Sequence, residues 1–154
     1  MAPVLLGLAI VSAGLYAGFM LIFLTGIMPA LARLTDEQFV AAMRRINEDV
    51  PRGVFVTVMF ASVAFPVAAV FVPVDDRNGA ETALLIAGTV CVFLNHVITA
   101  AGNIPLNNEL AASEARGAAD HEVREAFEAR WNRLHLVRTL LVTAGFALVV
   151  ASAL

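Results

Sequence analysis

The residues most suited to chemistry lie where the last apolar segment of the chain begins. Trp131, His135 and Arg138 follow one another at spacings of four and three residues, which places them on one face of a helix. A neutral histidine near a membrane interface can remove a proton from a weakly acidic carbon or phenol. An arginine beside it adds positive charge where the substrate becomes an anion. This face therefore predicts a site for proton abstraction, with His135 as the base.

A second set of polar residues ends the preceding apolar segment. His96, Asn103 and Asn107 are separated by seven and four residues, a spacing that again predicts one helical stripe. Asparagine amides can donate hydrogen bonds to an enolate or phenolate oxygen. Pro105 predicts a turn between the two asparagines, so that Asn103 and Asn107 form one wall of a pocket. We expect this wall to face His135, with His96 at a similar depth.

Composition indicates that these residues belong to a membrane protein. Of the 154 residues, 60% are hydrophobic and 15% are charged, and the mean hydropathy is +0.81. Soluble domains average about 45–50% apolar and about 25% charged residues. A helix needs roughly 20 apolar residues to cross the hydrocarbon core, and four segments meet this requirement: residues 4–28, 54–72, 83–102 and 134–154. We therefore predict one all-α integral membrane domain, residues 1–154, folded as an up-down-up-down four-helix bundle.

The connections between these spans differ in length and charge. Pro29 is expected to end the first span, and Thr35 with Gln38 forms a capping box that begins a short amphipathic helix suited to the membrane interface. Residues 120–133 are expected to run into the last span as one helix. Eight arginines lie in the first and third connections, and only Arg77 lies in the second. By the positive-inside rule, the long connections are cytoplasmic and both termini lie outside a plasma (inner) membrane.

Composition also excludes several classes of function. A net charge of −3 without a clustered basic face argues against nucleic-acid binding. All ten basic residues are arginine, so a lysine nucleophile or Schiff base is excluded. The single cysteine, Cys91, rules out an intrachain disulfide. The expected partners are a lipophilic small-molecule substrate and membrane lipid, with a second copy of the chain in a homo-oligomer as a further option.

Three of the candidate residues also have simpler explanations. His96 would fit a hydrogen bond between helices, and Trp131 would fit an anchor at the membrane interface. Arg138 lies about one turn inside its span, where a charge either extends towards the interface or needs a partner. That partner is either an anionic substrate or a carboxylate, for which the candidates are Asp49, Glu109 and Glu128.

Several short motifs along the chain together resemble one known family. They are "PAL" at the end of the first span, "IN" in the next helix, "GNIPLNNEL" after the third span and "FEARWNRLHLVRT" at the start of the fourth. In this order they resemble the DUF1772 family, which includes the anthrone oxygenase-like proteins. Carried over by position, the family pattern points to Asn47, Asn103, Pro105, Asn107, Trp131, His135 and Arg138. It thus adds Asn47, Trp131 and Pro105 as expected substrate-binding residues, beside His96, whose expected role in substrate binding depends on the stripe alone.

The resemblance implies four transmembrane helices and, for characterised members, oxidation of a phenolic anthrone to an anthraquinone without an added organic cofactor. The first hypothesis is accordingly an oxygenase (a monooxygenase) in which His135 removes a proton, Asn103, Asn107 and Arg138 stabilise the oxyanion, and O2 attacks the anion. A second version places copper or iron at His96 and His135, although their spacing fits no standard metal motif. The third hypothesis is a non-enzymatic membrane module that binds lipid or quinone, or a subunit of a larger membrane complex. A lipophilic cavity reaching His135 would favour an enzyme, whereas a filled core would favour the module.

Overall fold

The computed structural model describes residues 2–72 and 77–154, and these residues form helices and short connections without a strand. Four helical segments are long and apolar enough to cross a membrane: Pro3–Leu31, Gly53–Phe71, Gly79–Ala115 and Asp120–Ala151. The predicted all-α class with four helices of transmembrane length is therefore confirmed. The last segment is one unbroken helix, as predicted, because residues 120–133 continue directly into the apolar part.

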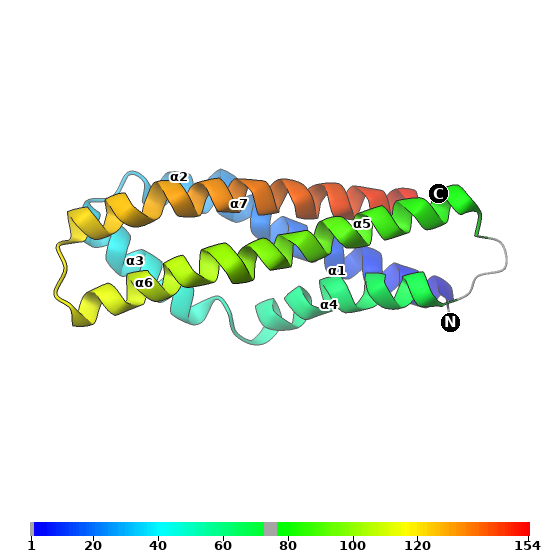
Figure 1. Cartoon of the computed structure of the whole chain (residues 1–154), viewed down its shortest axis with the longest axis horizontal. Coiled ribbons are helices and arrows are strands. Elements are labelled where there is room, and N and C mark those ends of the chain that lie inside the picture. Colours follow the sequence, from blue (N-terminus) through cyan, green and yellow to red (C-terminus); the bar gives the residue numbers. More distant parts are fainter. Residues whose placement is uncertain (1, 73–76) are drawn as a thin grey trace.

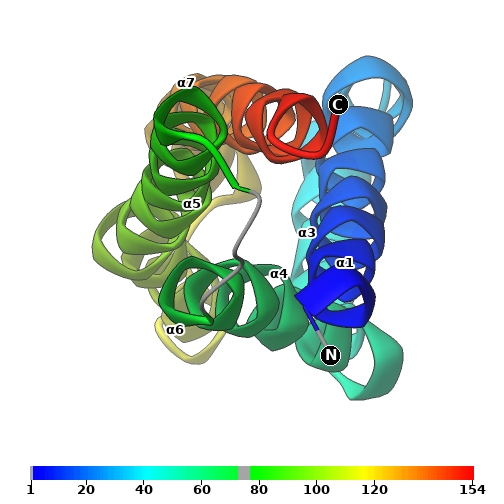
Figure 2. The same ribbon diagram turned by 90° about the vertical axis from the view of Figure 1, so that its right-hand side faces the viewer.

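The four long helices lie side by side as a bundle. Seen end-on in Figure 2, they follow one another around the bundle axis in the order α1, α4, α5 and α7. Their bounds are Ala2–Ile22 for α1, Gly53–Phe71 for α4, Gly79–Ile98 for α5 and Asp120–Ala151 for α7. The two chain termini lie at one end of the bundle, and the shorter helices α3 (Asp36–Asp49) and α6 (Ile104–Ala115) lie at the other (Figure 1).

Two of the long segments contain a π-helical turn just ahead of a proline. The turn η1 (Phe23–Ile27) joins α1 to the short helix α2 (Met28–Leu31), and η2 (Thr99–Asn103) joins α5 to α6. In η1 the N–H of residue 28 bonds to the carbonyl of residue 23, and in η2 the N–H of residue 104 bonds to that of residue 99. Each bond spans five residues, so the backbone widens by one residue at these turns.

The wider turns explain why two sequence predictions are wrong. Proline lacks an N–H and its ring clashes with the carbonyl four residues earlier, which normally breaks a helix. Here the π-helical turn takes up the disruption, so Pro29 does not end the first helical segment, which continues to Leu31. Pro105 likewise does not form a turn between Asn103 and Asn107, because it lies in the first turn of α6 and the helix continues.

Two glycines hold α5 and α7 in close contact. A Cβ atom at Gly145 would lie 2.9 Å from the carbonyl oxygen of Gly88, and a Cβ atom at Gly88 would lie 2.9 Å from that of Gly145. The two backbones therefore touch directly, as at interfaces of small residues between membrane helices. This contact sets the distance between α5 and α7 and brings the polar face of α7 against the end of α5.

Helix α3 begins and packs as its sequence pattern indicates. The Thr35 and Gln38 side chains form the predicted capping box. The apolar face of α3, made by Phe39, Val40 and Met43, is fully buried against residues of α6 and α7. This packing places the C-terminal half of α3, with Asn47, beside the end of the bundle.

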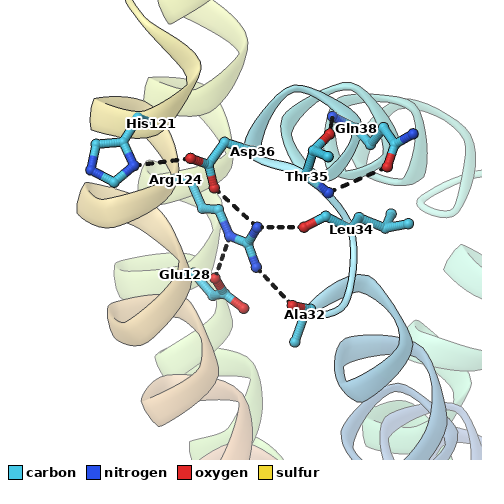
Figure 3. A network of polar contacts seen from close by, with 8 residues as sticks. All are labelled: Ala32, Leu34, Thr35, Asp36, Gln38, His121, Arg124 and Glu128. Carbon is cyan, nitrogen blue, oxygen red and sulfur yellow. Dashed lines mark hydrogen bonds and ion pairs between the residues drawn. The ribbon is translucent and has the colours of Figure 1, made fainter.

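An arginine on α7 ties α3 to the bundle, as Figure 3 shows. Arg124 Nη1 donates to the Leu34 carbonyl at 2.8 Å and to Asp36 Oδ1 at 3.1 Å, and Nη2 donates to the Ala32 carbonyl at 3.1 Å. Its Nε donates to Glu128 Oε2 at 2.7 Å. One guanidinium thereby holds the connection between α2 and α3 on the surface of α7.

The glycine contact leads to a first prediction. Gly145→Ala should lose about 1–3 kcal/mol of the free energy of unfolding, because the new methyl group overlaps the Gly88 carbonyl. Gly18→Ala is the matched control, since a Cβ atom there meets nothing within 4 Å and alanine is the better helix former. Thermal unfolding in detergent would measure both. Equal unfolding temperatures for the two variants would contradict a direct backbone contact.

A second prediction concerns pH, because His121 Nδ1 lies 2.9 Å from Asp36 Oδ2. Helix α7 is about 48 Å long at 1.5 Å per residue, more than the roughly 30 Å hydrocarbon core, and His121 is in its first turn, outside the apolar part. The hydrogen bond from His121, with a contribution from Arg124, lowers the pKa of Asp36. The same hydrogen bond raises the pKa of His121 from its ordinary value of 6.5.

The sign of each shift sets the pH window of this contact. The contribution of Asp36 to the free energy of unfolding is lost as pH falls through its lowered pKa. The contribution of His121 to the free energy of unfolding is lost as pH rises through its raised pKa. His121→Gln should therefore lower the unfolding temperature most at weakly acidic pH and little at alkaline pH. Arg130→Gln, an exposed change on the same helix, should leave the profile unchanged. A difference between His121→Gln and wild type that is constant with pH would contradict the ion pair.

Candidate functional site

A cavity of about 340 Å³ lies where α3, α4 and α6 meet α1 and α7. Its walls are mostly apolar side chains: Met20, Phe23, Ile46, Val50, Pro51, Phe55, Met59, Ile104 and Trp131. Its polar lining consists of Tyr16, Asn47, Thr99, Asn107, Asn108 and Arg138. An apolar cavity with a few convergent polar groups, at the small end of the range of about 300–1,000 Å³, is typical of a small-molecule site.

Arg138 supplies the charge in this cavity. It lies on α7 and is 7% exposed. Its Nε donates to His135 Nδ1 at 3.1 Å, and its Nη1 donates to Thr99 Oγ1 at 3.3 Å. The guanidinium carbon also lies 5.2 Å from the ring centre of Trp131, within reach of a cation–π interaction. All of these partners are neutral or aromatic, and none carries a negative charge.

None of the three carboxylates considered as partners of Arg138 pairs with it. Glu128 pairs with Arg124 at 2.7 Å, Asp49 pairs with Arg52 at 3.0 Å, and Glu109 is exposed. Within residues 2–72 and 77–154, no carboxylate lies at ion-pair distance from Arg138. A guanidinium has five N–H groups, and the hydrogen bonds above account for two of them. The remaining N–H groups are thus available to an anionic ligand in the cavity.

His135 lies behind Arg138 and is fully buried, outside the cavity lining. Its Nε2 donates to the Met20 carbonyl at 3.2 Å, and its Nδ1 accepts from Arg138. The ring stacks on Trp131 with centres 4.8 Å apart. Both ring nitrogens are therefore engaged, which favours a role in positioning Arg138 over the role of base that the sequence suggested.

Trp131 is fixed from two sides. Its Nε1 donates to Asn107 Oδ1 at 2.9 Å, which leaves the Asn107 amide N–H groups as donors beside the cavity. Its ring is only 3% exposed and stacks on Phe127 as well as on His135. Because it is enclosed by protein, Trp131 forms a wall of the cavity and has little surface with which to anchor the chain in lipid.

The other predicted amide, Asn103, lies outside the cavity lining. It is 1% exposed, and its Nδ2 donates weakly to the Trp131 carbonyl at 3.4 Å. Its Oδ1 has no hydrogen-bond partner. Asn103 thus links η2 to α7 beneath the site, and Asn107 alone of the two predicted asparagines lines the cavity.

His96 is turned away from the asparagine stripe. Its Nε2 lies 3.2 Å from Ser62 Oγ on α4, and its ring stacks on Tyr16 of α1 at 5.0 Å. The π-helical turn η2 explains the difference, because one extra residue rotates everything after it by about 100°. Asn95, one residue earlier, takes the place of His96 on the face toward α7 and is fully buried. The side-chain amide of Asn95 donates to the Arg138 carbonyl at 3.3 Å.

Asn47 faces the cavity from α3, and its Nδ2 is buried without a hydrogen-bond partner. Asn108, the residue after Asn107, also lines the cavity although it is largely exposed. Pro105 is exposed and takes no part in the lining; its contribution is to the π-helical turn before it. The predicted substrate-binding set is therefore divided, with Asn47 and Trp131 at the cavity and His96 and Pro105 outside it.

The two histidines belong to different polar clusters, one with Ser62 and Tyr16 and one with Met20 and Arg138. Among the described residues there is no group of three His, Cys, Asp or Glu side chains that could hold a metal ion. The copper or iron version thus has no set of ligands in this geometry.

Sequence reasoning missed the walls that α1 and α4 contribute. Tyr16, Phe55 and Met59 lie inside uniformly apolar spans, where periodicity gives no sign of which side faces a cavity. For Tyr16 there was a usable signal, since it is the single tyrosine of the chain and places a polar hydroxyl within a membrane span.

Comparison with known proteins identifies the family of the chain. No curated protein and no solved structure matches the chain significantly. A family described as anthrone oxygenase matches residues 39–148, well over half of the chain. The match includes the cavity residues of α3, α4, α6 and α7, with Asn47, Asn107, Trp131 and Arg138 among them. The chain therefore belongs to the anthrone oxygenase family.

Proposed function

We propose that this protein is a membrane oxygenase that binds a lipophilic polyaromatic phenol, such as an anthrone, and oxidises it with O2. The observation that carries the proposal is the buried Arg138, which has N–H groups without a carboxylate partner in a mostly apolar cavity. A cation in such a place stabilises the anionic form of a ligand whose remaining surface is apolar. A phenolate or an enolate on an aromatic skeleton has both properties.

The apolar walls suit a flat aromatic ligand. Phe23, Phe55 and Trp131 offer ring faces and edges, which pack well against another aromatic system. Met20 and Met59 add thioethers, which adapt to irregular shapes and contact aromatic rings favourably. The four helices apolar enough to cross a membrane support access from the lipid phase, in which such a compound dissolves.

Ionisation of the substrate is the step that the charge of Arg138 would promote. An opposite charge within a few ångströms lowers the pKa of an acidic group, and low dielectric strengthens the effect. The amide N–H groups of Asn47 and Asn107 are placed to donate to a second oxygen of the ligand. The anion is electron-rich at the ring carbon and reacts with O2. In this scheme the substrate proton leaves to water, and His135 holds Arg138 in its direction.

Arg138→Met tests this proposal directly. Loss of the cation should lower the rate of anthraquinone formation by about 10²–10³-fold, as removal of one oxyanion donor does in other enzymes. Methionine fills a similar volume, and apolar replacement of a buried charge is often neutral or stabilising, so the variant should remain folded. The assay is quinone formation from an anthrone in detergent, with the uncatalysed oxidation subtracted.

Arg133→Met is the matched control, because Arg133 is an exposed arginine on the same helix. It should keep the wild-type rate. Oxidation by Arg138→Met at the wild-type rate would contradict the proposed role of the cation. Binding of an anthrone by wild-type protein without any turnover would instead favour a binding module for lipid or quinone.

A further inference from the structure

We propose that Tyr16 is a catalytic proton-transfer residue of this site, acting on the oxygenated intermediate after O2 has reacted. The inference rests on the proposed oxygenase function and deepens it. Tyr16 lies on α1, outside residues 39–148 that match the family, and was not among the residues that the sequence pattern singled out.

The position of Tyr16 in the cavity is well defined. It is 1% exposed, and it lines the same cavity as Arg138 and Thr99. Its ring stacks on His96, with centres 5.0 Å apart and planes inclined by 26°, and meets Phe55 at 5.9 Å. The phenol is thus held from two sides and cannot turn freely away from the cavity.

The Tyr16 ring stacks on His96, and His96 in turn contacts Ser62. Ser62 Oγ lies 3.2 Å from His96 Nε2 and donates to the Met59 carbonyl at 2.7 Å. These contacts fix the imidazole on which Tyr16 stacks. They also give His96 a function, since it positions Tyr16 although it does not reach the cavity itself.

Tyr16 shares the cavity lining with the polar group around the cation. Thr99 lines the same cavity, and its Oγ1 accepts a hydrogen bond from Arg138 at 3.3 Å. The phenol of Tyr16 and the guanidinium of Arg138 therefore line the same cavity. The cavity lining holds two ionisable side chains, Tyr16 and Arg138, and a guanidinium does not release its proton in proteins. Tyr16 is thus the lining residue able to give and retake a proton.

The chemistry balances with O2 as the oxidant. The anionic carbon of the substrate bonds to O2 and becomes a carbon-bound peroxide anion. Tyr16 Oη–H donates its proton to the outer peroxide oxygen, giving a hydroperoxide and a tyrosinate. The tyrosinate then removes the remaining hydrogen of that carbon as a proton; the C–H electron pair forms the carbonyl as the O–O bond breaks and hydroxide leaves. Hydroxide combines with the proton lost in the first ionisation, so one methylene and one O2 yield one carbonyl and one water.

Tyr16→Phe separates this role from a structural one. The variant keeps the ring on His96 and loses only the hydroxyl, so anthrone should still bind with the same KM and still consume O2. Quinone formation should fall by at least about 10²-fold, the usual contribution of an acid–base residue, and a hydroperoxide should accumulate in acid-quenched samples. Thr57→Val is the control, because it removes an exposed hydroxyl from α4 and should leave O2 consumption and quinone formation equal.

The outcomes are distinct. Equal wild-type rates of O2 consumption and quinone formation in Tyr16→Phe overturn the inference and leave the proposed function intact. An equal loss of both rates, or a raised KM alone, also overturns it, since that is the effect of a residue that only shapes the cavity. Absence of anthrone oxidation by the wild-type protein overturns the proposed function and the inference with it.

A second substitution covers the case in which Tyr16→Phe does not fold. Tyr16 is the single tyrosine, so growth on fluorinated tyrosine labels this position alone and makes its phenol more acidic with little change in size. The pH at which quinone formation reaches its maximum should then move to lower pH, while KM stays constant. A pH profile identical to that of the unlabelled protein would overturn the inference.

Discussion

The arrangement of this protein depends on the burial of one arginine without a carboxylate partner. Moving a guanidinium out of water costs several kcal/mol unless charges or hydrogen bonds compensate. Around Arg138 the compensation is partial, because Thr99 and His135 accept one hydrogen bond each and Trp131 offers its ring face. The positive charge of Arg138 is therefore only partly compensated, and Arg138 lines a mostly apolar cavity. A site left in this state favours any ligand that brings an oxyanion on an apolar body.

The three side chains that contact Arg138 are each positioned by a different element of the bundle. His135 is fixed by a carbonyl of α1, Trp131 by an amide of α6, and Thr99 by its place in η2. The contact between Gly88 and Gly145 holds α7, which carries Arg138, close to α5. The cation is therefore preorganised, which is the condition under which electrostatic stabilisation of an anion is most effective.

Much of this could be predicted from the sequence, and the exceptions share physical causes. The apolar lengths, the capping box at Thr35 and the face formed by Trp131, His135 and Arg138 depend on local spacing, and the helices agree with it. The stripe with His96 failed because one inserted residue in η2 changes the rotation of the helix, which the spacing alone does not reveal. The engagement of both nitrogens of His135 depends on the direction of Arg138 and on a carbonyl of α1, both of which are properties of tertiary structure.

The two π-helical turns show how an apolar helix can change its course without exposing its backbone. In lipid, every N–H and carbonyl group needs a partner within the protein, so a loop within the hydrocarbon core is costly. A π-helical turn keeps the hydrogen bonds, widens the helix and rotates the residues after it. These turns lie just before Pro29 and Pro105, and the helices continue past both prolines. The rotation at η2 takes His96 out of the asparagine stripe and leaves its ring against Tyr16. His96 therefore contacts the phenol of Tyr16, on a different side of the helix from the asparagines.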